Sequence, residues 1–335
     1  MTESLTQQIA VGKGATEPAK GSPKLGQMLF DNIVWLLLVL FAVVGYLLNP
    51  FFFSVANFQN ILVQATTLGF LAVGVAFTLL IGEIDLSIVG VLGFSGALAA
   101  LALNAGAPAV IAILVAILTG VVIGLINGLC VAVLGMNSLI TTLAVGLTLT
   151  GAVLALTRGT TITITDPGYT FIGSGQIGGW PIMPLAIILL FVVISVVLRR
   201  TRWGRSIFAT GGNRRAAFAA GIPTTKVRVS AFMVSGLLAG TAGWLATAYL
   251  SGVNSTIGSE MMMYAIAAPV IGGVSLKGGI GRVSGILGGI LLITVVQVAM
   301  QLSSISAYYI SMIGGAMILI AVLLDVVRVR ASSRA

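Results

Sequence analysis

The sequence of 335 residues contains no histidine, one cysteine and few charged residues, and each shortage excludes a class of function. Without histidine, the chain has no imidazole for acid–base catalysis and no imidazole ligand for a metal. Cys130 alone forms no disulfide within the chain and no thiolate metal cluster. We therefore expect no catalytic residue, no metal site and no cofactor on this chain.

Charged residues make up only 7% of the chain, whereas hydrophobic residues make up 58%. A soluble domain carries roughly a quarter of charged residues, so lipid must be the solvent here. The net charge of +9 would raise the question of nucleic acid in a soluble protein, but basic residues in cytoplasmic loops explain it without a nucleic-acid partner. We predict an all-α integral membrane protein that contacts membrane lipid.

Long apolar runs divide the chain into about ten predicted transmembrane helices, since a helix needs about 20 apolar residues to cross a bilayer. We expect a disordered cytoplasmic tail over 1–28, a transmembrane domain over 29–327 and a second cytoplasmic tail over 328–335. The eighth run is short, so a broken or re-entrant helix is the alternative there. The predicted spans are Ile33 to Leu48, Ile61 to Ile81, Ile88 to Leu103, Ala109 to Leu134, Ser138 to Thr157, Ile182 to Leu198, Ser230 to Leu250, Met262 to Ser275, Val283 to Leu302 and Ala307 to Leu324.

The basic residues predict the orientation of these spans, because they favour loops that stay in the cytoplasm. With a cytoplasmic N-terminus, an even number of crossings returns the C-terminus to the cytoplasm, and Arg158 is the only basic residue in an outward loop. The outward segment 158–181 is rich in glycine and threonine, and we expect either a short hairpin or lid, or an ordinary connector. The basic residues assigned to cytoplasmic loops include Arg199, Arg200, Arg202, Arg205, Arg214, Arg215, Lys226, Arg228, Lys277 and Arg282.

The cytoplasmic loop 199–229 contains the signals of a short helix. A Gly-Gly turn at 211–212 precedes Asn213, which is suited to cap a helix over 213–220. Gly221 suits the end of this helix, and Pro223 blocks its continuation. A helix of this length is not stable alone, so it should pack against a partner; the alternative is that its arginines hold it at the membrane surface.

Two polar turns interrupt the apolar sequence. The first turn contains Asp85 and Ser87, and one of these two residues is expected to cap the following helix. The alternative is that the turn carries protons. The glycines of the second turn have spacings that permit close helix packing. The two turns share an Ile-Gly-x-aliphatic-(Asp/Ser)-Leu pattern about 190 residues apart, which suggests two related halves, an arrangement found in transporters. The second turn contains Gly272, Gly273, Ser275, Gly278 and Gly279.

Over roughly residues 55 to 325, the sequence resembles the permease subunits of ATP-binding-cassette (ABC) importers of the ribose, xylose, galactose and autoinducer type. The resemblance implies a multi-pass protein of the bacterial inner membrane with the fold of an ABC importer permease. The matching residues are Gly82, Ile84-Asp85-Leu86-Ser87, Ser95-Gly96, Asn127-Gly128, Ile140, Thr142-Leu143, Gly204-Arg205, Gly211-Gly212-Asn213, Ala216-Ala217, Gly221-Ile222, Ala265-Ile266-Ala267-Ala268, Ile271-Gly272-Gly273, Ser275-Leu276 and Gly278-Gly279-x-Gly281.

By this resemblance, the segment 211–222 is the coupling helix that docks on a cytoplasmic ABC ATPase. ATP and Mg²⁺ then belong to the ATPase, and this chain has no G-x-x-x-x-G-K-[ST] loop. The resemblance also implies a second permease copy or homologue, a periplasmic solute-binding protein, and a monosaccharide or sugar-like solute. The expected coupling residues are Gly211, Gly212, Asn213, Arg214, Arg215, Ala216, Ala217, Gly221 and Ile222, and the expected turn or gating residues are Asp85, Ser87, Gly272, Gly273, Ser275, Gly278 and Gly279.

The sequence departs from the family pattern in three places. Glu83 stands where a glycine usually precedes Ile-Asp-Leu-Ser, and Arg214-Arg215 stands where an acidic residue is common. Met262-Met263-Tyr264 replaces a usual Glu-Leu-Asp before Ala-Ile-Ala-Ala. The first and third departures alter the local charge, and the second leads us to expect a more acidic docking surface on the ATPase.

A secondary carrier driven by protons or sodium is the main alternative, because many spans and internal repeats suit it equally well. Such carriers usually couple through ionisable groups near the membrane midplane, whereas Glu83, Asp85 and Glu260 fall near predicted helix ends. An intramembrane enzyme would need a paired acid and base, and a channel would need polar rings; the sequence indicates neither. The polar residues that either line the translocation path or join helices are Gln64, Asn127 and Gln297.

Overall fold

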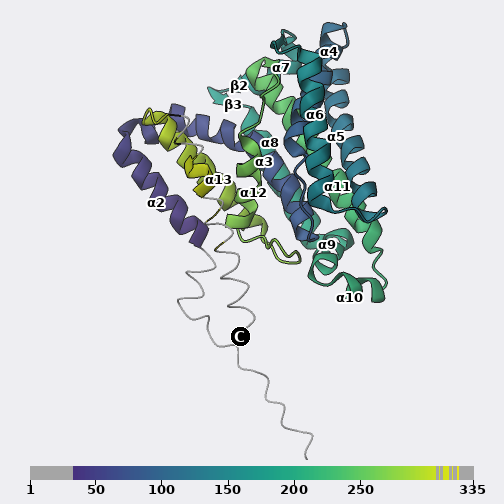
Figure 1. Cartoon of the computed structure of the whole chain (residues 1–335). Coiled ribbons are helices and arrows are strands. Elements are labelled where there is room, and N and C mark those ends of the chain that lie inside the picture. Colours follow the sequence, from purple (N-terminus) through teal and green to yellow (C-terminus); the bar gives the residue numbers. More distant parts are fainter. Residues whose placement is uncertain (1–32, 307–308, 310–311, 317–318, 320–322, 324–335) are drawn as a thin grey trace, which may run out of the picture. The chain divides into compact units, whose positions relative to one another are not determined.

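The computed structural model describes residues 33–306, 309, 312–316, 319 and 323, and this part of the chain is almost entirely helical (Figure 1). The predicted tails 1–28 and 328–335 and most of the predicted span Ala307 to Leu324 lie outside the described residues. The helices are α2 (Ile33–Leu48), η1 (Pro50–Phe53), α3 (Val55–Leu80), α4 (Ile88–Asn104), α5 (Ala109–Ala132), α6 (Ser138–Thr157), α7 (Pro167–Ser174), α8 (Met183–Arg200), α9 (Arg202–Gly212), α10 (Arg214–Ala219), α11 (Thr224–Leu250), α12 (Met261–Ile271) and α13 (Val283–Leu302), and the strands are β1 (Ile162–Thr163), β2 (Gln176–Ile177), β3 (Trp180–Pro181) and β4 (Gly252–Val253).

A helix occupies each predicted span from the first to the ninth. Among the described residues, α3, α5, α6, α8, α11 and α13 are long and apolar enough to cross a membrane, and α2, α4 and α12 are shorter apolar helices. α12 has 11 residues, so it spans about 16 Å of a hydrocarbon core that is about 30 Å thick. The structure therefore supports the alternative of a broken helix at the eighth predicted span.

Two helices begin earlier than the apolar runs predicted. α3 starts at Val55 rather than Ile61, because Ser54 caps it by accepting a hydrogen bond from a backbone amide of its first turn. α11 starts at Thr224 rather than Ser230, and its first two turns contain the buried Arg228. A count of apolar residues misses these first helical turns, because a polar side chain that finds a hydrogen-bond partner does not interrupt a helix. The predicted loop 199–229 is consequently largely helical.

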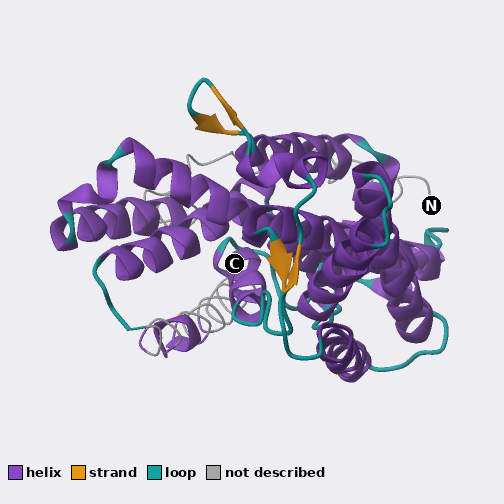
Figure 2. Cartoon of the chain, turned by 90° about the horizontal axis from the view of Figure 1, so that it is seen from above, coloured by secondary structure: helices purple, strands orange, loops and turns teal. Residues whose placement is uncertain are grey.

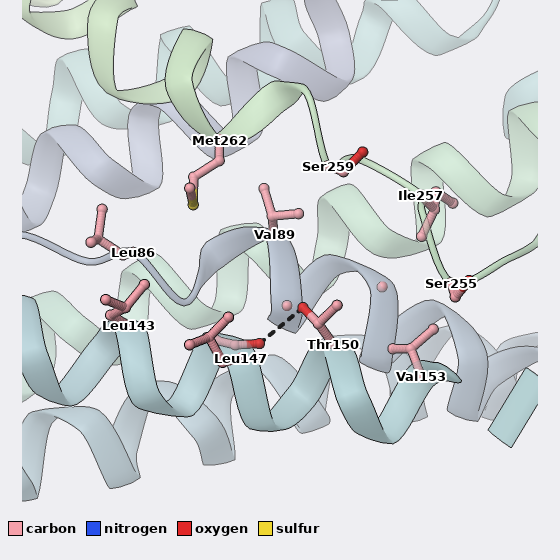
Figure 3. A pocket seen from close by; sticks show the side chains of 13 residues that line it. Leu86, Val89, Leu143, Leu147, Thr150, Val153, Ser255, Ile257, Ser259 and Met262 are labelled. Carbon is pink, nitrogen blue, oxygen red and sulfur yellow. Dashed lines mark hydrogen bonds between the residues drawn. The ribbon is translucent and has the colours of Figure 1, made fainter. Parts of the chain in front are cut away.

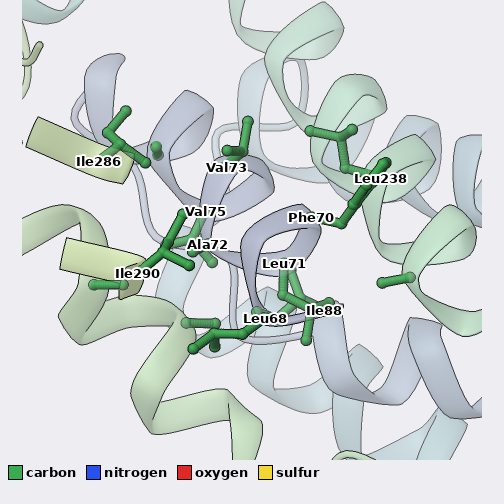
Figure 4. Packing of buried hydrophobic residues seen from close by; sticks show 14 of the residues in the cluster. Leu68, Phe70, Leu71, Ala72, Val73, Val75, Ile88, Leu238, Ile286 and Ile290 are labelled. Carbon is green, nitrogen blue, oxygen red and sulfur yellow. The ribbon is translucent and has the colours of Figure 1, made fainter. Parts of the chain in front are cut away.

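α3 is the most deeply buried of the long helices, with 89% of its most apolar window inside the protein. Its side chains belong to a hydrophobic cluster that includes Leu238 of α11 and Ile290 of α13 (Figure 4). Helices on both sides of α3 thus share one core. From Leu68 to Leu80, α3 contains one polar residue, Thr78, and every residue is buried, as expected for a helix segment that is surrounded by protein.

α5 and α11 pack against each other at backbone distance. A Cβ atom on Gly120 would overlap the carbonyl oxygen of Gly236, and one on Gly124 would overlap the carbonyl oxygen of Phe232. Small residues of this kind let membrane helices approach closely, because lipid supplies no hydrophobic force to hold them together. The contact between α5 and α11 therefore depends on glycine.

Segments predicted to lie on the same side of the membrane also lie together in the structure. At one end, α9 and α10 meet the turns that follow α3 and α12, where the Gly279 amide donates to the Leu80 carbonyl oxygen at 2.9 Å. At the other end, β1 pairs with β4, and the Gln59 side chain donates to the Gly179 carbonyl oxygen at 2.9 Å. Figure 1 shows α9 and α10 at the lower end and α7 and β2 at the upper end.

The segment 158–181, which was predicted to face outward, contains a short hairpin, one of the two expectations for it. β2 and β3 pair in antiparallel register, and Gly178 and Gly179 between them have φ of 58° and 80°, as a tight hairpin turn requires. The hairpin projects from the helices (Figure 2). α7 precedes it and is held by a 2.8 Å hydrogen bond between the hydroxyls of Tyr169 and Thr247. Burial raises the pKa of Tyr169 to about 12, so this bond does not change near neutral pH.

The contact between α5 and α11 predicts a difference between two glycine substitutions. Gly124→Ala places a methyl group on the Phe232 carbonyl, whereas Gly151→Ala on α6 meets nothing within 4 Å. Both changes gain helix propensity, so their difference isolates the contact. We expect Gly124→Ala to lower the free energy of unfolding in detergent by about 1–3 kcal/mol relative to Gly151→Ala, as overpacking does. Equal stability of the two variants in a thermal or denaturant titration would contradict the contact.

Candidate functional site

Asp85 is buried in the turn after α3, and its carboxylate is the centre of a hydrogen-bond network. It accepts hydrogen bonds from the Ser87 amide at 2.9 Å, the Ser87 hydroxyl at 2.6 Å and the Ser235 hydroxyl of α11 at 2.7 Å. Asn127 of α5 donates to the Ser87 hydroxyl oxygen at 2.8 Å. These bonds compensate the desolvation of the carboxylate and tie α5 and α11 to the start of α4.

The predicted capping role of this turn is wrong for α4. Ser87 occupies the N-cap position, but its side chain makes no capping hydrogen bond, because its hydroxyl donates to Asp85. Asp85 itself binds the amide of Ser87, outside the helix. A polar residue before a helix is a visible sequence signal, but the choice between a nearby amide and a distant hydroxyl is made by tertiary packing.

Glu83, one of the departures from the family pattern, forms an ion pair with Arg228 of α11. The guanidinium of Arg228 is buried and also donates to the carbonyl oxygens of Val131 at 3.2 Å and Ala132 at 3.5 Å, in the last turn of α5. Helix ends leave such carbonyls without partners inside the helix. Partial burial and the charge of Arg228 lower the pKa of Arg214 on α10, and Glu83 opposes this shift. The three charges thus act on one another.

α10 is the predicted short helix. Asn213 caps it by accepting a hydrogen bond from the Ala216 amide at 3.0 Å. At its other end Gly221 has φ of 82°, and the Ile222 amide donates back to the Ala217 carbonyl oxygen, which is a Schellman cap. The predictions for Asn213 and Gly221 are therefore confirmed.

Gly211 and Gly212 do not form the predicted turn, because they are the last residues of α9. A Cβ atom on Gly211 would overlap the Leu80 carbonyl oxygen and lie against the Gly279 amide, so this glycine serves packing. A Cβ atom on Gly278 would also clash with the backbone of Gly82. α9 was not expected from the sequence, although Thr201, whose side chain accepts from the Gly204 amide, is a recognisable N-cap.

The turn after α12 is built from the predicted glycines and Ser275. Gly278 and Gly279 have φ of 87° and 75°, and the Ser275 hydroxyl oxygen accepts from the Lys277 amide at 3.2 Å. Gly272 packs against the carbonyl of Gly285 on α13, which confirms close helix packing.

The two turns share backbone geometry, but in a register one residue away from the sequence match. Gly82 and Gly273 have φ of 76° and 89°. In each turn the next residue, Glu83 or Val274, donates its amide to the carbonyl five residues back, as in a Schellman cap. The structural match therefore pairs Gly82 with Gly273 rather than with Gly272.

The exposed face of α10 contains Arg214, Arg215 and Phe218, the last with 70% of its surface exposed. Ala217, in contrast, is buried within the chain. Phe218 was not among the predicted site residues, although an aromatic residue that follows two arginines on a short helix is a signal of docking.

A polar pocket of about 380 Å³ lies between α3, α13 and the start of α12. It contains Gln64 and Gln297, two of the three predicted path residues, whereas Asn127 lies in the Asp85 network. Gln64 also donates to the Gln301 side chain at 3.3 Å. The other residues that line the polar pocket include Thr256, Ser259, Glu260 and Tyr264.

A second, smaller pocket of about 180 Å³ adjoins the first along the segment before α12 (Figure 3). α4 and α6 line it with mostly apolar side chains such as Val89 and Leu147. Ser259 contributes to both pockets. The Thr150 hydroxyl within it donates to the Gly146 carbonyl oxygen at 3.0 Å, so this polar group is already satisfied.

The structure has long apolar helices with loops grouped at their two ends, a polar pocket, and an exposed basic helix. These features define a multi-pass membrane protein of the transport type. Among the described residues, no group of three His, Cys, Asp or Glu side chains is placed to hold a metal ion. The comparisons with known proteins identify the class more closely.

Residues 57–322 match the family described as the permease component of the branched-chain amino acid transport system. The chain is 38% identical to the ribose import permease protein RbsC of Bacillus subtilis (strain 168), over 88% of this chain and 94% of that protein. It is 34% identical to the L-arabinose ABC transporter permease protein AraH of Azospirillum brasilense, over 93% of this chain and 92% of that protein. The chain therefore belongs to this family of inner-membrane permeases. No solved structure matches it.

Adjacent glycines at the end of α9 give a second prediction. Gly211→Ala forces apart the ends of α3 and α9, whereas Gly212→Ala meets nothing within 4 Å. We expect Gly211→Ala to cost about 1–3 kcal/mol of stability and Gly212→Ala to be near neutral. Limited proteolysis of the α9–α10 segment and thermal unfolding measure the difference, and a Gly212→Ala defect as large as that of Gly211→Ala would show that the packing is not as described.

Proposed function

We propose that this chain is the permease subunit of an ATP-driven importer that passes a monosaccharide or sugar-like solute into the cytoplasm. The observation that carries the proposal is the similarity, over nearly the whole chain, to permeases named for ribose and arabinose. The family description names branched-chain amino acids, but amide and carboxylate side chains line the polar pocket, and they suit hydroxyl groups better than aliphatic side chains.

The proposed orientation has both termini and the α9–α10 end in the cytoplasm. It is supported by the distribution of charge: Arg199 and Arg200 end α8, Arg202 and Arg205 lie in α9, and only Arg158 belongs to the predicted outward loops. A periplasmic solute-binding protein would then approach the end that contains α7 and the β2–β3 hairpin. A second permease copy or homologue would complete the path.

The ATPase is proposed to dock on α10 and to supply ATP and Mg²⁺. Arg214 and Arg215 favour an acidic groove on the ATPase, and Phe218 favours an apolar pocket within that groove. Ala217 and Gly211 support the surface from within the chain and do not face the partner.

Gln64 and Gln297 are proposed to lie on the solute path, together with Gln301. Asn127 is left out, because it is buried in the Asp85 network. The turns that contain Asp85 and Ser87, and Gly272 to Gly279, are proposed to transmit movement between the spans and the coupling end. The family assignment leaves the secondary-carrier alternative without support.

Charge reversal on α10 tests the docking proposal. Arg214→Glu with Arg215→Glu should weaken co-purification of the ATPase by about tenfold or more, because like charges would then meet across the interface. The matched control is Arg158→Glu at the opposite end, which should co-purify normally. ATPase association that survives the double reversal would contradict an acidic docking groove.

Uptake into proteoliposomes tests the function and the path. With the ATPase, the binding protein and ATP, we expect ribose or arabinose to be accumulated, and we expect none without ATP. Gln64→Leu should reduce uptake about threefold to tenfold, the effect of losing one hydrogen bond, while Asn104→Leu outside the pocket should not. Accumulation driven by an ion gradient without ATP would overturn the proposal in favour of a secondary carrier.

A further inference from the structure

Two carboxylates in the turn after α3 hold α11 at two points on one face. Glu83 pairs with Arg228, and Asp85 accepts from Ser235, which lies seven residues further along the helix. Residues seven apart in a helix project from the same face. The turn therefore fixes both the rotation of the first half of α11 about its axis and its position along that axis.

The same turn holds α5. The Ser87 hydroxyl oxygen accepts a hydrogen bond from the side-chain amide of Asn127. The Arg228 guanidinium donates hydrogen bonds to the last carbonyl oxygens of α5. Between these attachments, Gly128 lies against the backbone of Val229. α5, the turn and the first half of α11 are thus joined by charge, by hydrogen bonds and by backbone contact.

α10 connects directly to this joined unit. The segment from Ala220 to Pro223 is short, and the Ile222 amide and the Thr224 amide are both engaged in backbone hydrogen bonds. Pro223 also restricts its own φ. A displacement of α10 consequently reaches the first turn of α11, which directly precedes Arg228.

Stability alone does not account for a buried ion pair in this position. Removing both charges from water costs about as much as their attraction returns, so such pairs contribute little net stability and serve better to fix one geometry. Here the pair links the helix that follows α10 to a turn 145 residues away in sequence.

We infer that Glu83 is a positioning residue for energy coupling: its ion pair with Arg228 makes α11 move with α5, so that displacement of α10 by the ATPase reaches the spans. Without the pair, the first turn of α11 bends and absorbs the displacement. This inference rests on the proposed function. Glu83 contacts neither solute nor nucleotide in this account.

The test uses Glu83→Gln, which keeps the shape of the side chain and removes its charge, in the full complex with ATPase and binding protein. We expect normal assembly, ATP hydrolysis within about twofold of the wild type, and at least about fivefold less solute transported per ATP hydrolysed, the lower limit of typical coupling energies. Glu83→Asp, which restores the charge, should recover part of the ratio. Glu83→Gln combined with Arg228→Met should be no worse than the more defective single variant, because the pair acts as a unit.

The outcomes separate this inference from the function on which it rests. A wild-type complex without ATP-dependent uptake means that the proposed function fails. A coupled wild type with an unchanged transport-to-ATP ratio in Glu83→Gln overturns the inference alone. Failure of Glu83→Gln to assemble also overturns it, since Glu83 would then serve folding. Effects that multiply in the double variant would show that Glu83 and Arg228 act independently.

Discussion

The close packing of α5 against α11 is the contact on which the hydrogen-bond network around Asp85 depends. Because Gly120 and Gly124 bring the two backbones together, Asn127 on α5 and Ser235 on α11 both reach the turn that contains Asp85. Membrane helices gain no hydrophobic force from one another in lipid, so close packing and buried hydrogen bonds must hold them. A wider separation of α5 and α11 would break either the hydrogen bond from Ser235 to the Asp85 carboxylate or the one from Asn127 to Ser87.

The polar pocket and the end of α9 lie towards opposite ends of α3. Its first half contributes Gln64 to the pocket, and its last carbonyl, on Leu80, receives the Gly279 amide beside Gly211. A helix that is buried from Ala65 to Leu80 is suited to transmit movement, since packed interiors shift between discrete arrangements instead of deforming continuously. The polar pocket and the end of α9 are therefore joined by a packed helix rather than by a loop.

Local features of the fold could be predicted from the sequence, and long-range features could not. The spans, the Asn213 cap of α10 and the outward hairpin depend on residues close together in the chain, so their signals are visible directly. The partners of Glu83 and Asp85 lie 145 and 150 residues away, and apolar patterns carry no information about such pairs. Gly211 misled the prediction for a related reason: a glycine required by a neighbouring backbone resembles a glycine required by a turn.

The central claim is that α10, α11 and α5 move as one unit when the ATPase acts. Spin labels at the native Cys130 on α5 and at an introduced Ala220→Cys would report the distance across this unit, and a second pair at Ala220→Cys and Ser284→Cys, in a Cys130→Ser background, would report movement relative to α13. Between nucleotide-free and ATP-trapped complexes, the account predicts an unchanged first distance and an altered second distance. A first distance that changes while the second stays constant would contradict it.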